Sequence, residues 1–109
     1  MVEVSPPEAV ALVEAGAMLL DVREPDEWEA GHVPGATFIP MGEVQTRVGE
    51  LPVEGQVVVM CRAGHRSAIV TEALLRTGID AVNLAGGISA WAASDRPVAK
   101  GDGSPGTII

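Results

Sequence analysis

The one cysteine of the chain, Cys61, follows an uncharged run and precedes two arginines. Residues 57–60 read Val-Val-Val-Met, which predicts a strand buried on both faces. A helix is expected about six residues later, over residues 67–76. The backbone N–H groups of the intervening loop, and the positive end of that helix, can then point at the cysteine sulfur. Such surroundings favour thiolate over thiol, so the pattern indicates a nucleophilic cysteine.

The residues after Cys61 are suited to holding an anion. Two arginines carry permanent positive charges, Gly64 allows the backbone angles of a tight loop, and residues 55–71 contain no acidic side chain. A lone cysteine at the end of a buried strand is more often a small core side chain. The arginines, the glycine and the expected helix start together favour the nucleophile. The residues predicted to bind substrate are Arg62, Ala63, Gly64, His65, Arg66 and Ser67.

Charge and composition limit the partners. The net charge is −8, and residues 1–60 hold 11 of the 15 acidic side chains but two of the seven basic ones. This acidic balance argues against nucleic acids and anionic membranes as partners but leaves small anions. One cysteine and two histidines are a poor set of metal ligands, so neither a metal nor a cofactor is expected. A single unpaired cysteine predicts a reducing, cytoplasmic location, and neither a signal peptide nor a membrane span is expected. A monomer is taken as the default oligomeric state.

Strands and helices are expected to alternate along the chain. Strands are predicted at residues 2–4, 18–22, 37–39, 57–60 and 80–84, and helices at residues 6–15, 25–30, 43–50, 67–76 and 88–93. This order predicts one α/β domain over residues 1–99, with a parallel sheet covered on both faces and ligands bound beyond the carboxyl ends of the strands. Residues 100–109 are rich in glycine and are expected to form a flexible tail that does not dock on the domain.

Three segments resemble the motifs of one family. Residues 61–67 (Cys-Arg-Ala-Gly-His-Arg-Ser) resemble the active-site loop of rhodanese-type sulfurtransferases. Residues 20–28 with residues 31–36 resemble the family's N-terminal signature, and residues 84–91 its C-terminal one. The resemblance implies a single-domain, rhodanese-like three-layer fold, whose central five-stranded sheet is mostly parallel.

The resemblance also implies a reaction. The thiolate of Cys61 would attack the outer sulfur of a donor such as thiosulfate, become a persulfide, and pass the sulfur to cyanide or a thiol. Arg66 would meet the sulfonate end of the donor. Asp21 would support the loop by accepting its hydrogen bonds, and Arg23 would pair with an acid such as Glu27; both are interpreted as scaffold.

Other functions stay open. The chain can instead be a sulfur-relay or binding module that passes sulfur between protein partners, or an interaction domain without catalysis. A phosphatase or arsenate reductase is disfavoured because four residues separate Cys61 from Arg66, where related phosphatases have five. A tighter loop suits one sulfur atom better than a tetrahedral phosphate.

The remaining polar and aromatic candidates are interpreted mostly as structural. His32 is expected to make structural hydrogen bonds, and the His65 side chain to point outward. The two tryptophans, Trp28 and Trp91, are expected to be core or rim anchors. The acidic cluster of residues 24–29 is expected to be a solvated face.

Overall fold

Five parallel strands, in the order β1-β5-β4-β2-β3, form the centre of the computed structural model, which describes residues 1–109. The elements are β1 (Glu3–Val4), α1 (Pro6–Glu14), β2 (Met18–Asp21), α2 (Pro25–Ala30), β3 (Thr37–Phe38), η1 (Met41–Glu43), η2 (Val48–Glu50), β4 (Gln56–Met60), α3 (His65–Arg76), β5 (Asp80–Leu84) and α4 (Gly87–Ala93). The expected α/β architecture with a five-stranded sheet is confirmed. Because all strands run the same way, the ends of β2, β4 and β5 meet at one edge.

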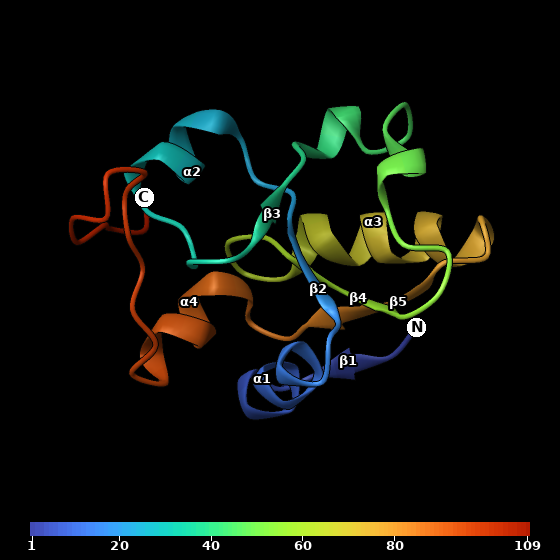
Figure 1. Ribbon diagram of the computed structural model, residues 1–109, viewed down its shortest axis with the longest axis horizontal. Coiled ribbons are helices and arrows are strands. Elements are labelled where there is room, and N and C mark those ends of the chain that lie inside the picture. The colour runs from blue at the N-terminus through green and yellow to red at the C-terminus, as the bar shows by residue number, and fades with distance from the viewer.

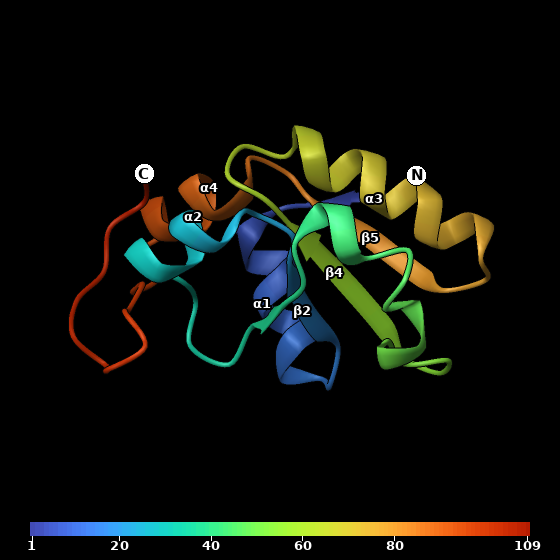
Figure 2. The same ribbon diagram turned by 90° about the horizontal axis from the view of Figure 1, so that it is seen from above.

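The central strand β4 contributes side chains to both hydrophobic cores, which lie on opposite faces of the sheet. Val57 and Val59 pack into one cluster with α3, η1 and η2, whereas Val58 and Met60 pack into the other with α1 and α4. This alternation follows from the two-residue period of a strand. Helices α1 and α3 accordingly cover opposite faces of the sheet (Figure 1) (Figure 2). None of the helices is long and apolar enough to span a bilayer.

Local signals define the first helix as the sequence predicts. Ser5 accepts a hydrogen bond from the backbone N–H of Glu8 (3.3 Å), and the Glu8 carboxylate accepts one from the Ser5 N–H (3.0 Å). This capping box satisfies donors that have no partner within the helix. The helix ends at Glu14, just before Gly16.

The prediction of a continuous helix over residues 43–50 is wrong. The structure has the two short 3₁₀ helices η1 and η2 there, with a turn between them. Glycines at 42 and 49 and β-branched side chains weaken a continuous α-helix. Arg47, in the turn, binds Glu43 (3.1 Å) and Glu50 (2.8 Å), which ties the two short helices together.

Helix α3 begins at His65, two residues earlier than expected. Gly64 takes the left-handed conformation (φ +105°) and is the N-cap, so the turn into the helix is completed within residues 61–64. His65 and Arg66 therefore lie in the first helical turn instead of in the loop.

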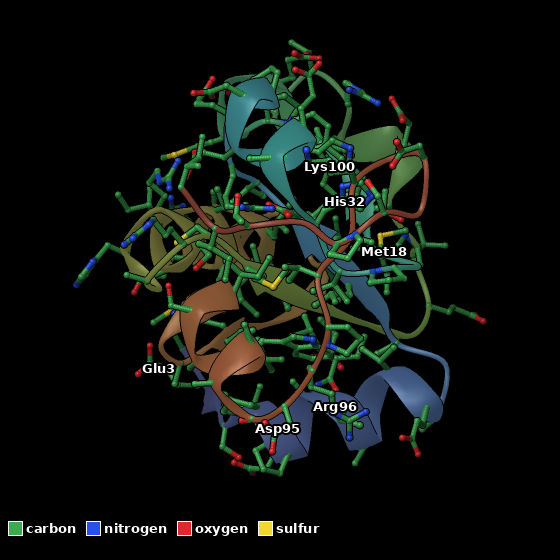
Figure 3. The ribbon with its side chains drawn as sticks, turned by 90° about the vertical axis from the view of Figure 1, so that its left-hand side faces the viewer. Glu3, Met18, His32, Asp95, Arg96 and Lys100 are labelled. Atoms are coloured by element: carbon green, nitrogen blue, oxygen red, sulfur yellow. The ribbon has the colours of Figure 1, made fainter.

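The expectation that residues 100–109 stay off the domain is corrected by the structure. The chain turns back after Ala99, which pairs with both His32 and Pro105. Figure 3 shows Lys100, the next residue, near His32. The N–H of Thr107 donates to the Ala30 carbonyl (2.8 Å), and Ile108 packs against the core cluster that contains Trp91. Two glycines, Gly31 and Gly106, permit this contact because a Cβ on either would collide with the opposite backbone.

Candidate active site

Cys61 lies at the carboxyl end of β4 and is 1% exposed. Helix α4 holds the backbone here: the N–H of Ile88 donates to the Cys61 carbonyl (2.8 Å), and that of Ser89 to the Arg62 carbonyl (3.2 Å). Gly87 makes this approach feasible, since its φ is +62° and a Cβ would collide with both carbonyl oxygens. Gly87 of the C-terminal signature thus has a physical role, because it lets α4 dock on the cysteine loop.

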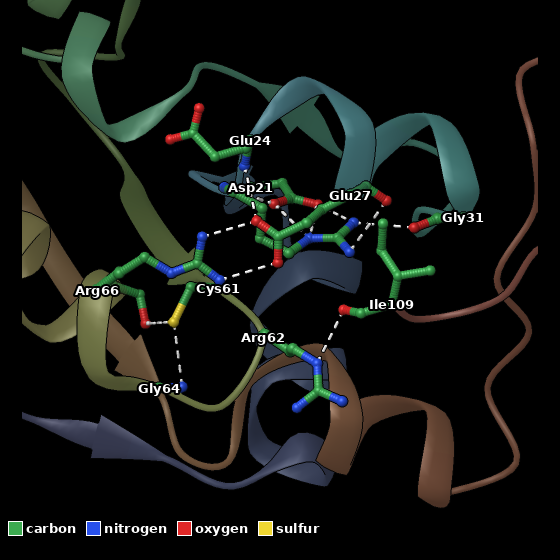
Figure 4. A network of polar contacts seen from close by, with 11 residues as sticks. Asp21, Glu24, Glu27, Gly31, Cys61, Arg62, Gly64, Arg66 and Ile109 are labelled. Atoms are coloured by element: carbon green, nitrogen blue, oxygen red, sulfur yellow. Dashed lines mark hydrogen bonds and ion pairs between the residues drawn. The ribbon is translucent and has the colours of Figure 1, made fainter.

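The cysteine sulfur receives two hydrogen bonds (Figure 4). The Gly64 N–H donates to Sγ at 3.1 Å and the Ser67 hydroxyl at 3.2 Å. Burial raises the pKa of Cys61, but the Ser67 hydroxyl and the nearby backbone N–H groups of Ser67, Gly64 and Ala63 lower the pKa by more. The pKa of Cys61 therefore lies below its ordinary value, as expected for a nucleophilic thiolate.

The hydroxyl of Ser67 gives a direct test of this environment. In Ser67→Ala the thiolate loses a donor, and a hydrogen bond to a charged group is worth about 1.5–3 kcal/mol. We expect the pKa of Cys61 to rise. At a fixed pH below the titration midpoint of Cys61 in the original chain, the thiolate fraction should then fall by about tenfold or more. Thiolate ultraviolet absorbance measured against pH checks this without ambiguity, because Cys61 is the chain's only thiol.

A matched control is Ser89→Ala, which removes a hydroxyl without a hydrogen bond in the structure and should leave the titration unchanged. If Ser67→Ala titrates like the original chain, the serine does not stabilise the thiolate.

Arg66 is bound by an acid that the sequence analysis assigned to a solvated face. Its Nη1 and Nη2 donate to the two carboxylate oxygens of Glu27, at 2.7 and 2.9 Å. The Arg66 hydrogen bond lowers the pKa of Glu27, and Glu27 in turn raises the pKa of Arg66, so both groups stay charged. The acidic cluster is therefore not wholly solvated, and Glu27 is a site residue that sequence reasoning missed. No spacing signal marks it, because 39 positions separate the partners.

Arg62 and His65 face outward. Arg62 is exposed and donates from Nε to the backbone oxygen of Ile109 (2.9 Å), so the turned-back tail reaches the rim of the site (Figure 4). The His65 side chain is exposed, in line with the orientation expected for it.

Asp21 and Arg23 form a buried ion pair with each other, and both side chains are 0% exposed. Asp21 accepts from the Arg23 Nε (3.0 Å) and Nη2 (2.8 Å) and has no bond to the cysteine loop, which corrects that expectation. Arg23 pairs with an acid, as expected, but that acid is Asp21 and not the Glu27 carboxylate given as the example. Arg23 instead donates to the carbonyls of Glu27 (3.3 Å) and Gly31 (2.9 Å) and so fixes the end of α2. A buried guanidinium is stable only when a carboxylate compensates its charge and its remaining N–H groups find hydrogen-bond acceptors.

Asn83 is a second site residue that the sequence analysis did not single out. Its Nδ2, on β5, donates to the Gly64 carbonyl (3.1 Å) and to the Glu3 carboxylate (2.9 Å). It therefore supports the cysteine loop at the residue that adopts the left-handed conformation. A signal exists in the sequence: Asn83 is the one amide side chain within an otherwise apolar strand end.

The histidine and tryptophan side chains near α2 have structural contacts. The His32 Nδ1 lies 2.9 Å from the Trp28 carbonyl, so it donates there, and the two rings stack with centroids 3.8 Å apart. Trp28 also stacks on Phe38 at 4.9 Å. Trp91 is 5% exposed and belongs to the core. The hydrogen bond of His32 and the positions of Trp28 and Trp91 agree with the structural hydrogen bonding expected of the histidine and the anchoring expected of the tryptophans.

Comparison with known proteins agrees with the fold. A sequence profile described as the rhodanese-like domain matches residues 5–94. The chain belongs to the rhodanese-like domain family.

Relatives of the chain carry names from sulfur chemistry. A sulfurtransferase of Allochromatium vinosum is 38% identical over 87 residues, which cover 79% of this chain and 81% of that protein. The putative sulfur carrier protein YrkF of Bacillus subtilis is 36% identical over 74 residues, 67% of this chain and 40% of that protein. Among solved structures, the thiosulfate sulfurtransferase from Pseudomonas aeruginosa is similar with a TM-score of 0.82 and 29% identity, over 100% of this chain and 22% of that one. The chain thus spans less than half the length of two of these three proteins.

Proposed function

We propose that this domain is a sulfurtransferase that carries a sulfane sulfur on Cys61 as a persulfide. The observation that carries the proposal is the buried sulfur with two hydrogen-bond donors at the carboxyl edge of the sheet. The same donors that favour a thiolate also favour a persulfide anion. The first turn of α3 adds N–H groups that have no acceptor within the helix.

With thiosulfate as donor, the Cys61 thiolate attacks the outer sulfur. A sulfur–sulfur bond forms at Cys61 while the donor's sulfur–sulfur bond breaks, and sulfite leaves with the bonding electron pair. Cyanide or a thiolate then attacks the outer sulfur of the persulfide and regenerates the Cys61 thiolate. No proton needs to be removed in either step when the sulfur is already ionised.

The basic residues beside the loop support the choice of an anionic substrate. Arg62 lies on the rim, and Arg66 lies in the first turn of α3. We propose that residues 62–67, in the loop and the first turn of α3, bind the donor mainly through backbone N–H groups. Arg62 attracts the donor, and Arg66, which is paired with Glu27, contributes less. Because the reaction needs a reduced cysteine, a reducing compartment such as the cytoplasm suits it.

A sulfur-relay role is the second candidate. The name of the Bacillus relative, a putative sulfur carrier protein, favours it, and the exposed loop flank at Arg62 and His65 is open to a partner. The donor and acceptor would then be proteins bearing a persulfide and a thiol. Both candidates use the same persulfide on Cys61.

A burst experiment tests the enzymatic proposal. Thiosulfate without an acceptor should release one equivalent of sulfite per chain and then stop, and added cyanide should restart release with formation of thiocyanate. A protein that releases no sulfite from thiosulfate but accepts sulfur from a persulfide donor would support the relay role instead. Hydrolysis of an aryl phosphate with no sulfur uptake would contradict both.

A further inference from the structure

The carboxylate of Glu27 forms an ion pair with Arg66, one of the two arginines that follow Cys61. Both terminal nitrogens of Arg66 are engaged in a two-pronged ion pair, in which the side chains are 35% exposed for Arg66 and 13% for Glu27. Figure 4 shows this pair directly beside Cys61. The positive charge of Arg66, which could otherwise attract an anionic donor, is therefore already compensated by Glu27 in the folded protein.

Glu27 is held in place independently of Arg66. Its carboxylate also accepts from the backbone N–H of Glu24 (2.9 Å) in the capping box of α2. Its own carbonyl accepts from Arg23, which is anchored on the buried Asp21. A carboxylate fixed in this way cannot simply swing aside when a donor arrives, so an incoming anion meets its negative charge.

The other cation at the site lies at the rim. Arg62 is exposed, and its Nε donates a hydrogen bond to the Ile109 backbone oxygen. An exposed charge is well screened by water and salt. The charge on Arg66 interacts with that on Cys61, so neutralising Arg66 weakens the positive field at the sulfur itself.

We propose that Glu27 is a specificity-determining residue, which disfavours small dianionic sulfur donors relative to persulfide donors. The inference rests on the proposed sulfur transfer through Cys61. Thiosulfate brings two negative charges to the site around Cys61, whereas a persulfide brings one at most. The Glu27 carboxylate, which is fixed and paired with Arg66, therefore weakens the binding of thiosulfate more than that of a persulfide.

The persulfide reaction balances without a further reactant. The Cys61 thiolate attacks the outer sulfur of R–S–SH, the donor's sulfur–sulfur bond breaks, and R–S⁻ leaves while Cys61 becomes a persulfide. One sulfur–sulfur bond replaces another, so there is no net oxidation, and no second negative charge needs to enter the site.

The test compares Glu27→Gln with Glu29→Gln, which removes one charge from an exposed position on the same helix. Glutamine at 27 keeps an oxygen for the Glu24 N–H. We expect Glu27→Gln to raise kcat/KM for thiosulfate by about tenfold, mainly through KM, since one compensating charge is lost near a dianion. The value for the persulfide of 2-mercaptoethanol should change by less than about twofold. Glu29→Gln should change neither value.

Two results would overturn the inference. If Glu27→Gln lowers kcat/KM for both donors equally, Glu27 only positions Arg66; if both donors are unaffected, its charge plays no part. Ionic strength provides a check on the unchanged protein: compensation of Arg66 predicts a weak salt dependence of thiosulfate kcat/KM, and a steep decrease with salt would contradict it. Failure of the unchanged protein to take sulfur from either donor would instead refute the proposed function, together with this refinement of it.

Discussion

Cys61→Ser is expected to abolish sulfur transfer, with thiocyanate formation from thiosulfate and cyanide reduced by about 10³-fold or more. The serine hydroxyl is not ionised near neutral pH and cannot carry the sulfur as a persulfide. Because Cys61 is the only cysteine, no other thiol of the chain can replace it. Steady-state thiocyanate formation measures the loss.

The serine variant should otherwise keep the fold. The substitution changes one atom at a position that already receives two hydrogen bonds, so the melting temperature should stay within a few degrees of the original. Cys61→Ala serves as a second variant with no nucleophile. Retention of more than a tenth of the activity by either variant would refute a covalent role for Cys61.

The largest effect on stability is expected for Asp21→Asn. The substitution removes the negative charge from a pair that is 0% exposed on both sides, which leaves the Arg23 guanidinium charged and uncompensated inside the protein. Breaking such a buried pair from one side costs roughly 3–5 kcal/mol. Urea unfolding should therefore show a decrease of that size in the free energy of unfolding.

A matched control is Asp26→Asn, which makes the same chemical change at an exposed position of α2. Its free energy of unfolding should stay within about 0.5 kcal/mol of the original. If Asp21→Asn costs less than about 1 kcal/mol, the buried pair contributes no more than an exposed one. Because Arg23 also holds the end of α2, Asp21→Asn should loosen Glu27 and Arg66 as well.

The parts of the site that follow from local sequence could be predicted. The strand before Cys61 shows in its β-branched run, and the first helix in the spacing of Ser5 and Glu8. The sequence predicts Gly64 and Ser67 near the sulfur, and both donate to it. These features depend on residues within a few positions of one another, where periodicity and capping apply.

The contacts that depend on the assembled sheet could not be predicted in the same way. Glu27 is brought to Arg66, and Asn83 to Gly64, only because the ends of neighbouring parallel strands converge. The docking of the tail likewise depends on the match between Gly31 and Gly106. The charge cluster around Glu27 carries no local signal that separates one bound carboxylate from its solvated neighbours.

The most direct test of the central claim, that Cys61 carries the transferred sulfur, is the intact mass of the protein after incubation with a sulfur donor and removal of the excess. The account predicts a gain of one sulfur atom, located by peptide mapping on Cys61 and lost again when a thiol or cyanide is added. An unchanged mass with both thiosulfate and a persulfide donor, or an added sulfur that persists in Cys61→Ser, would contradict it.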